Sequence, residues 1–415
     1  MPARRLAARW VLPVAGPAVA HGAVLLGEDG RIEAVGPDAL VPHPAGLPAE
    51  RFPDAILIPG LVNVHTHLEL TGFDLGAREP DFRSWIGRVR SVKETRDGDA
   101  FLAAARDGLA DCWAGGVTTV ADTGDSGSAI RALAEAGGSG IAYQEVFGPH
   151  PAQAAASLAG LRSRVAELGR YAGGRVRLGV SPHAPYTVSG PLYAAVAAWA
   201  EEDGLPLAVH LAESRAESAL LERGGGPFAL AWRERGIPLP PGDGCSPVAW
   251  LDRHGVLGER TLCIHVVQAV EADLARLAHR GCAIAHCPLS NAAHGHGAAP
   301  LAGFLAHGLP VGVGTDSVLS VGRLDLLEET QAARRLAGLD AAGALALATL
   351  GGARALGLGG EIGSLEPGKW GDCAVIRPRQ ADGDPAEQVL QARRDDVIAT
   401  FLGGRDVYRA DPMPT

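Results

Sequence analysis

Short, nearly continuous runs of apolar residues recur between residues 56 and 357, and each is followed by a polar segment and an Ala- and Leu-rich stretch. The stretches 101–115 and 273–281 are examples, with helical composition and a closing glycine. Apolar strands that alternate with helices predict a parallel sheet covered by helices. The runs predicted as strands are 61–65, 116–122, 140–146, 176–181, 206–212, 261–267, 282–288 and 310–316.

Eight strand–helix units favour a closed (β/α)8 barrel of the TIM type over an open doubly wound sheet. No Gly-x-Gly-x-x-Gly follows the first predicted strand, which counts against a dinucleotide-binding fold. The predicted fold class is therefore α/β, with a TIM-like barrel as its main domain.

The two ends of the chain have a different pattern, with short strands and tight turns. Segment 21–37 reads as two strands joined by a turn at 28–30, so we interpret it as a β-hairpin and not as part of a secretory signal. We expect segments 1–55 and 358–415 to form one small β-sandwich-like domain, with the catalytic barrel, 56–357, inserted between them. No uninterrupted apolar run of about 18 residues occurs, so no membrane partner is expected.

Charge and cysteine usage narrow the choice of partner and compartment. The formal net charge of -10 argues against a nucleic-acid partner, which would need a basic surface. The six cysteines form no Cys-x-x-Cys pair, which favours free buried thiols and a reducing, cytoplasmic location. The expected partner is a small-molecule substrate, and a homodimer is left open.

Histidine and aspartate residues stand at or just after the ends of five predicted strands. Any one such histidine is more often a core residue than a ligand, but five strands with this feature are hard to explain by packing alone. Because carboxyl ends of barrel strands meet at one mouth, we expect these side chains to converge. The residues are His65, His67, His183, His210, His265 and Asp316.

Four of these residues form a candidate metal site. Residues two apart on a strand face the same side, so His65 and His67 can reach one ion. With His210 and Asp316 they provide three nitrogen ligands and one oxygen ligand for a divalent ion, which lowers the pKa of its bound water towards about 7. No lysine lies near a strand end in the sequence to bridge two ions, so we predict one ion.

Glu213 follows His210 by three residues. At that position a carboxylate can reach a bound substrate without binding the ion, as a general acid requires. The alternative is a solvated glutamate in a loop. Beside a metal-bound water we favour the catalytic role.

Five motifs together resemble the hallmarks of the amidohydrolase superfamily, in the branch of cytosine, guanine and S-adenosylhomocysteine deaminases and triazine chlorohydrolases. They are PGLVNVHTH, HLAE, AHCPLSN, GTDS and the C-terminal stretch from ATLGGARALGL to IGSLEPGKWGDCAVI. The resemblance implies that zinc, or iron as an alternative, binds to the four ligands. It also implies that Glu213 transfers protons, Asp316 accepts the proton of the water, His265 orients that water and His183 contacts the substrate.

A narrower resemblance is to aminodeoxyfutalosine deaminases, and it rests on HTHLELTGFDL and DFRSWIGRV. It implies that Glu69 and Trp85 line a pocket for a nucleoside-like substrate. Glu69 would accept hydrogen bonds from ribose hydroxyls, Trp85 would stack on a base and Arg88 would pair with a substrate carboxylate. Trp85 is equally compatible with a core position in its helix.

His294 and His296 stand in a glycine-rich segment. We interpret them as surface-loop residues, with a weak adventitious metal site as the alternative.

These features predict a metal-dependent hydrolase acting on a carbon–nitrogen bond, by deamination of an aminated purine or nucleoside-like heterocycle. Glu213 favours deamination because departing ammonia needs a proton donor. The alternatives are a cyclic amide hydrolase, a ring chlorohydrolase and, remotely, a non-catalytic scaffold.

Overall fold

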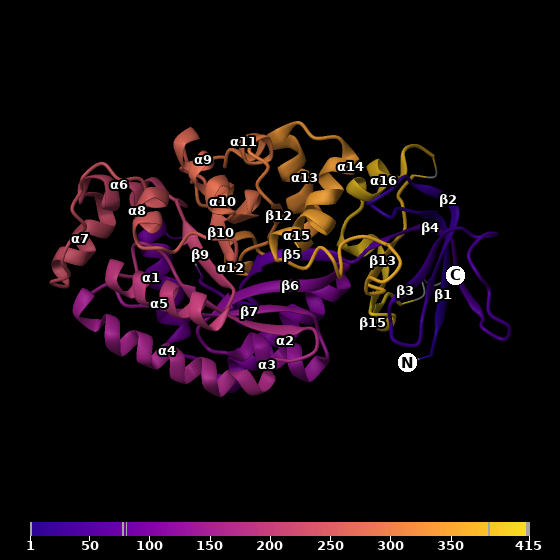
Figure 1. Cartoon of the computed structure of the whole chain (residues 1–415), viewed down its shortest axis with the longest axis horizontal. Coiled ribbons are helices and arrows are strands. Elements are labelled where there is room, and N and C mark those ends of the chain that lie inside the picture. The colour runs from indigo at the N-terminus through magenta and orange to yellow at the C-terminus, as the bar shows by residue number, and fades with distance from the viewer. Residues whose placement is uncertain (1, 77–78, 80, 381, 412–415) are drawn as a thin grey trace.

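The computed structural model describes residues 2–76, 79, 81–380 and 382–411. Figure 1 shows a helix-covered barrel and, beside it, a sheet in which strands from both ends of the chain lie together. Residues 1 and 412–415, at the outer ends of the predicted β-domain, lie outside the described residues.

The barrel contains all eight predicted strands. Neighbours in the sequence pair in parallel from the first to the eighth. A parallel bridge between Thr66 and Asp316 joins the last strand to the first and closes the barrel. The strands are β5 (Leu61–Thr66), β6 (Val117–Gly124), β7 (Gly140–Val146), β8 (Val176–Pro182), β9 (Leu207–Leu211), β10 (Thr261–His265), β11 (Ala283–His286) and β12 (Val311–Val313).

Buried apolar side chains fill the barrel and the layer between its strands and helices. Ile141, Tyr143, Ala208 and Ile264, from three strands, share one interior cluster, whereas a larger cluster joins the outer strand faces to the helices. The helices are α1 (Phe82–Lys93), α2 (Gly98–Ala114), α3 (Ser128–Ala136), α4 (Ala154–Leu168), α5 (Gly190–Asp203), α6 (Arg215–Arg223), α7 (Gly226–Glu234), α8 (Pro247–Arg253), α9 (Glu271–Arg280), α10 (Pro288–Ala293), α11 (Leu301–Ala306), α12 (Val318–Val321), α13 (Leu326–Ala337), α14 (Ala341–Ala346), α15 (Gly352–Ala355) and α16 (Pro385–Gln391).

The second part is a single mixed sheet of seven strands. Strands β1 and β4 are parallel and the other pairs are antiparallel, in the order β15-β14-β13-β4-β1-β2-β3. Strand β4 continues past the predicted boundary at residue 55, so we propose that the barrel domain begins after Pro59. The strands are β1 (Arg4–Val11), β2 (Val19–Leu26), β3 (Ile32–Pro37), β4 (Ala49–Pro59), β13 (Cys373–Ile376), β14 (Val397–Leu402) and β15 (Arg405–Arg409).

Three smaller expectations can be compared with the structure. Strands β2 and β3 form the predicted hairpin. All six cysteines are buried and free, as expected. Within the described ranges, no helix combines the length and the apolar character needed to span a bilayer.

Candidate active site

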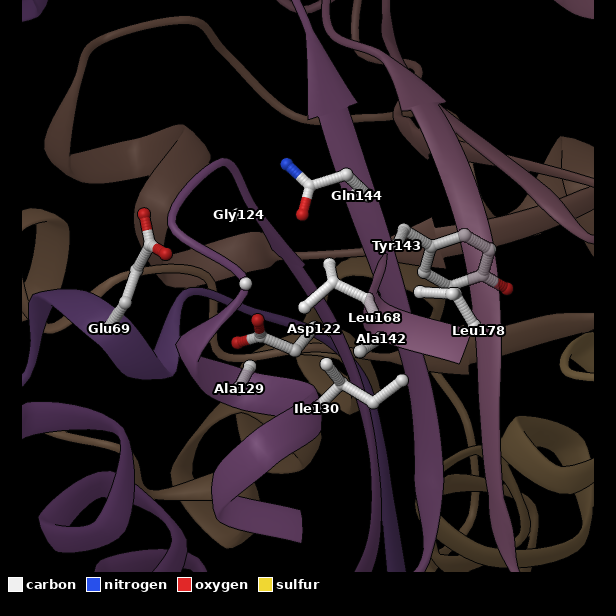
Figure 2. A pocket seen from close by; sticks show the side chains of 11 residues that line it. Glu69, Asp122, Gly124, Ala129, Ile130, Ala142, Tyr143, Gln144, Leu168 and Leu178 are labelled. Atoms are coloured by element: carbon white, nitrogen blue, oxygen red, sulfur yellow. The ribbon is translucent and has the colours of Figure 1, made fainter. Parts of the chain in front are cut away.

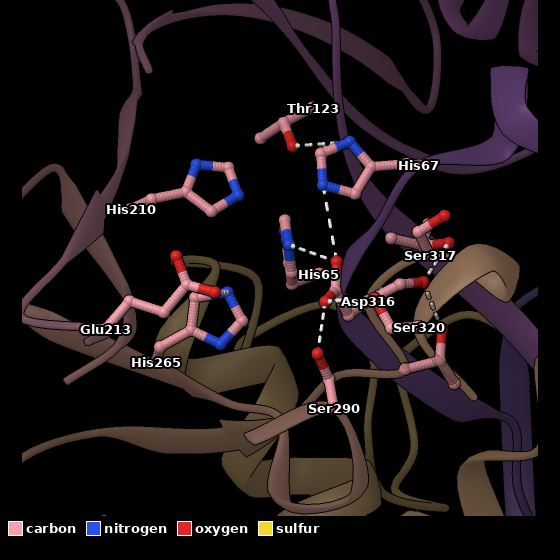
Figure 3. A network of polar contacts seen from close by, with 12 residues as sticks. His65, His67, Thr123, His210, Glu213, His265, Ser290, Asp316, Ser317 and Ser320 are labelled. Carbon is pink, nitrogen blue, oxygen red and sulfur yellow. Dashed lines mark hydrogen bonds and ion pairs between the residues drawn. The ribbon is translucent and has the colours of Figure 1, made fainter. Parts of the chain in front are cut away.

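Three histidines and an aspartate converge at the carboxyl ends of the strands (Figure 3). The Nε2 atoms of His65 and His67 each lie 3.4 Å from Oδ1 of Asp316. The ring of His210 lies 5.0 Å from the ring of His65 and 5.6 Å from that of His67, measured between centroids. The structure therefore brings together the four residues predicted as metal ligands.

The chemistry of this set fits a divalent cation. His65 is fully buried, and neither ring nitrogen makes a hydrogen bond with the described part of the chain. Burial lowers the pKa of His65 to about 4, and burial together with His183 and His65 holds the pKa of His210 well below its usual value. His65 and His210 are therefore in the neutral form that binds metal ions. Burial lowers the pKa of His67, but Asp316 outweighs burial and raises it to about 9, so metal binding would displace a proton from His67.

Hydrogen bonds outside the ligand set orient it. The side-chain oxygen of Asn63 accepts from the backbone N–H groups of His65, at 3.3 Å, and Thr315, at 3.1 Å, so the ends of β5 and β12 are held together. Nδ1 of His210 lies 3.2 Å from the carbonyl oxygen of His183. Such a contact to one ring nitrogen fixes the imidazole and leaves Nε2 for the metal.

Asp316 is oriented by hydroxyl groups on its other oxygen. Ser290 and Ser320 donate to Oδ2 at 2.5 and 3.1 Å, which leaves Oδ1 facing His65 and His67. A buried aspartate with one oxygen satisfied by hydroxyls and the other facing two imidazoles suits a monodentate metal ligand.

Unusual backbone conformations concentrate at this mouth. Ala212, His265, Val266 and Asp316 have φ values of 50°, 71°, 47° and 56°, in the left-handed region that non-glycine residues rarely adopt. Each such residue costs about 1–3 kcal/mol and persists where the surroundings impose it. The strain lies at the ends of β9, β10 and β12, where the predicted functional residues stand.

Glu213 is a buried carboxylate and not a solvated loop residue, with 3% of its surface exposed. Its Oε1 lies 3.7 Å from Nε2 of His265 and 3.4 Å from Nε2 of His296, and the Tyr186 hydroxyl donates to Oε2 at 3.4 Å. Burial raises its pKa, but His265 and His296 outweigh burial and lower the pKa to about 2. These two histidines therefore favour the ionised form of Glu213.

His265 is turned towards Glu213 by a neighbouring amide. Its Nδ1 lies 2.9 Å from Oδ1 of Asn291 in the AHCPLSN motif, so Nε2 is left facing the mouth. Ring nitrogens of His65, His210 and His265 lie within 4.8 Å of one another, which places His265 beside the predicted metal ligands.

Glu217 is a residue of this site that our sequence reasoning missed. Its carboxylate accepts the backbone N–H groups of Ala212 at 2.7 Å and of Glu213 at 3.0 Å. Ser214 caps the start of α6 by accepting the N–H of Glu217 at 3.3 Å. The Ser-x-x-Glu pattern of a helix start was the available sequence signal.

The predicted substrate-binding residues lie at different places around the mouth. His183 stands directly after β8, with Nδ1 2.8 Å from the Thr187 hydroxyl. Trp85 lies on α1, half-buried, with its ring 4.4 Å from that of His294. Arg88 is exposed on the same helix and donates to the carbonyl of Leu75 at 3.1 Å.

Glu69 is buried, and contacts within the protein occupy both of its carboxylate oxygens. Oε1 lies 2.5 Å from Nζ of Lys93, and Oε2 accepts the N–H of Ser126 at 3.1 Å and also the Ser126 hydroxyl. A direct contact with ribose hydroxyls would require Glu69 to give up some of these bonds. Figure 2 shows Glu69 and Asp122 among the residues that line a small cavity, which none of the four predicted metal ligands lines.

The position of Lys93 was not evident from the sequence. It lies on α1, far along the chain from any strand end, yet its ammonium group pairs with Glu69 and Asp125 beside the mouth. These two carboxylates raise its pKa despite burial, so Lys93 is a charged ion-pair partner and not the bridging group that a two-metal site would need.

The surface-loop interpretation of His294 and His296 is wrong for His296. Only 8% of His296 is exposed, its ring lies 4.5 Å from that of Phe82, and it contacts Glu213. His294 is partly buried between Trp85 and the Ser320 hydroxyl, 3.2 Å from the latter. The flanking glycines allow this segment to fold inward, so they did not indicate exposure.

Glu145, at the end of β7, is a further residue that the sequence reasoning missed. It is 7% exposed, and its Oε1 is buried without a hydrogen-bond partner among the described residues. A carboxylate oxygen of Glu145 and ring nitrogens of His183 and His210 lie within 4.8 Å of one another.

An eight-stranded barrel with this ligand set defines a metal-dependent hydrolase, and comparison with known proteins agrees. The amidohydrolase family model matches residues 56–407, so the chain belongs to the amidohydrolase family, as its motifs predicted. An aminodeoxyfutalosine deaminase from Deinococcus radiodurans is 36% identical over 352 residues, which cover 81% of each chain.

Two further proteins resemble almost the whole chain. A 5-methylthioadenosine/S-adenosylhomocysteine deaminase from Moorella thermoacetica is 32% identical over 413 residues, 95% of this chain and 91% of the relative. The crystal structure of an adenosine deaminase from Xanthomonas campestris with bound zinc has a TM-score of 0.85 at 26% identity. It covers 97% of this chain and 92% of the other.

Proposed function

We propose that this protein is a hydrolytic deaminase of an adenine nucleoside and uses one zinc ion held by His65, His67, His210 and Asp316. The single observation that carries the proposal is Glu213, a buried carboxylate in contact with His265 and His296 at the edge of a complete candidate ligand set. That arrangement provides a proton carrier where an amino group would leave. The resemblance to deaminases over most of the chain supports the same reaction.

Each residue of the site has a separate role in the proposed reaction. A bound divalent ion acidifies water and so supplies a nucleophile at neutral pH. Glu213, as a carboxylate, takes one proton of the water and delivers it to a ring nitrogen of the substrate, where it stays, and the proton taken by Asp316 passes to the departing amine. Water thus replaces the amino group at the ring carbon, and ammonia leaves. Asp316 accepts the second proton of the water, and His265, fixed by Asn291, orients that water.

The remaining assignments follow the same proposal. Zinc is favoured over iron by the zinc-bound adenosine deaminase of similar fold. His183 and Trp85 contact the base, and Arg88 is the candidate partner for an acidic group on the substrate. The six free cysteines fit a cytoplasmic location, and a homodimer remains a prediction.

The substrate is an adenine carried on a modified ribose, with aminodeoxyfutalosine as the leading candidate and 5′-methylthioadenosine and S-adenosylhomocysteine as alternatives. Relatives named for these activities match 81% to 95% of the chain. The test is ammonia release by the zinc-loaded protein from these three compounds and adenosine, with guanine, cytosine and a chlorotriazine as counter-substrates. Deamination of at least one adenine nucleoside is expected. Hydrolysis of only the chlorotriazine, or of no compound, would remove the proposal.

A further inference from the structure

The side chain of Glu145 points into the barrel mouth. Ile141 and Tyr143, four and two residues earlier on β7, belong to the buried cluster inside the barrel. Alternate residues of a strand face the same side, so Glu145 continues this interior row at its carboxyl end. His210 stands in the same way two residues beyond the interior Ala208.

The carboxylate of Glu145 is desolvated and has unused hydrogen-bonding capacity. The side chain is 7% exposed, and Oε1 has no hydrogen-bond partner in the described part of the chain. Leaving such an acceptor unsatisfied costs about 1–3 kcal/mol, more when it is charged. A buried acceptor beside a catalytic centre with no protein donor is a candidate for contact with a ligand.

A second metal site would also explain Glu145, but the geometry disfavours it. The third possible ligand, His210, has Nδ1 against the carbonyl of His183 and offers only Nε2, which the first site uses. Glu145 and His183 alone are too few ligands for a stable zinc site.

The surroundings favour a neutral donor over a cation. Burial, the largest effect, raises the pKa of Glu145 to about 7, while His67 and Lys93 lower that pKa and Asp125 and Glu69 raise it. Charges of both signs therefore already surround this carboxylate, with Lys93 paired to Glu69 and Asp125. Hydroxyl groups donate without adding charge, and the two oxygens of a carboxylate can accept from a pair of neighbouring hydroxyls.

We infer that Glu145 is the acceptor for substrate hydroxyls and selects nucleosides with an intact 2′,3′-diol. The inference rests on the proposed function, and it assigns the diol to Glu145 because Glu69 is engaged with Lys93 and Ser126. Phe147, two residues on, is 41% exposed with its ring 5.0 Å from that of His183, and it provides an apolar wall beside this acceptor.

The test compares Glu145→Gln with the wild type and with a matched variant, Glu69→Gln. The probes are 5′-methylthioadenosine, which has the diol, and 2′,3′-dideoxyadenosine, which lacks it. For Glu145→Gln, kcat/KM for the diol substrate should fall by about tenfold or more, mainly through KM, and change by less than about threefold for the dideoxy compound. Zinc content should stay at the wild-type level. Glu69→Gln should affect both substrates alike.

Two results would overturn the inference. One is an equal loss on both probes, and the other is loss of zinc from Glu145→Gln, which would make Glu145 a ligand. If the wild type deaminates neither compound, the proposed function is decided separately by the full substrate panel. Calorimetric binding of both probes to the zinc-loaded proteins then decides the role of Glu145. A loss of affinity in Glu145→Gln that is confined to the probe with the diol supports the inference. Equal affinity of the wild type for the two probes contradicts it.

Discussion

Nε2 of His296 lies 3.4 Å from Oε1 of Glu213, and both side chains are buried. His296 thus connects Glu213, the proposed proton carrier, to α1, because its ring also packs 4.5 Å from Phe82 on that helix. The contact makes a glycine-flanked segment part of the catalytic environment.

Replacing His296 with Ala should lower kcat/KM by about tenfold and leave zinc content unchanged. His296 is one of the groups that lower the pKa of Glu213, so its loss should raise that pKa and move the acid limb of the kcat/KM profile to higher pH. His294→Ala is the matched control, since His294 contacts Trp85 and Ser320 and should change KM without moving the limb. Identical pH profiles for the two variants would contradict this role.

Glu213→Gln should retain zinc and lose most turnover, by about 10²-fold or more, because the amide cannot carry the proton. Steady-state kinetics on the best substrate together with elemental analysis provide the measurement. Turnover near the wild-type rate would show that Glu213 has no part in proton transfer.

The purified protein should hold about one divalent ion per chain, and removing it with a chelator should abolish activity and lower Tm, because binding stabilises the folded state. Zinc should restore both properties. His210→Ala should fail to retain the ion, whereas exposed His279→Ala should bind it normally. Two tightly bound ions per wild-type chain would contradict the single-ion assignment.

The barrel could be predicted because its strands are buried on both faces and therefore appear as uninterrupted apolar runs. The convergence of the candidate ligands could be predicted because His65, His210 and Asp316 stand where such runs end. The arrangement of strands in the small domain, expected to be sandwich-like, could not be derived from the pattern of apolar residues. Strand β4 pairs with β1 on one side and with β13, far along the chain, on the other, and local sequence does not specify such partners.

Residues that act through three-dimensional neighbours were the ones missed. Glu145 is a single acidic residue near the end of a strand, and its significance depends on His183, which follows the neighbouring strand β8. Lys93 reaches the mouth only because α1 folds over it, a long-range packing event with no local signature.

Glu217 fixes the backbone that carries Glu213. In Glu217→Gln only one side-chain oxygen remains to accept the N–H groups of Ala212 and Glu213. The left-handed backbone conformation of Ala212 (φ 50°) is therefore held less firmly. We expect kcat to fall by about tenfold with zinc retained and KM little changed, since positioning of Glu213 matters most in the transition state.

The pH dependence of Tm distinguishes this role of Glu217 from a general loss of stability in the variant. Burial raises the pKa of Glu217 to about 8, against 4.5 for an ordinary glutamate, although the backbone N–H groups oppose the shift. The stability that this group contributes is fully present below pH 4.5 and is lost as the pH rises through 8. Glutamine does not titrate, so Tm of Glu217→Gln relative to wild type should increase between pH 6 and 9. Exposed Glu202→Gln should show no such trend, and parallel curves for Glu217→Gln and wild type would refute the raised pKa.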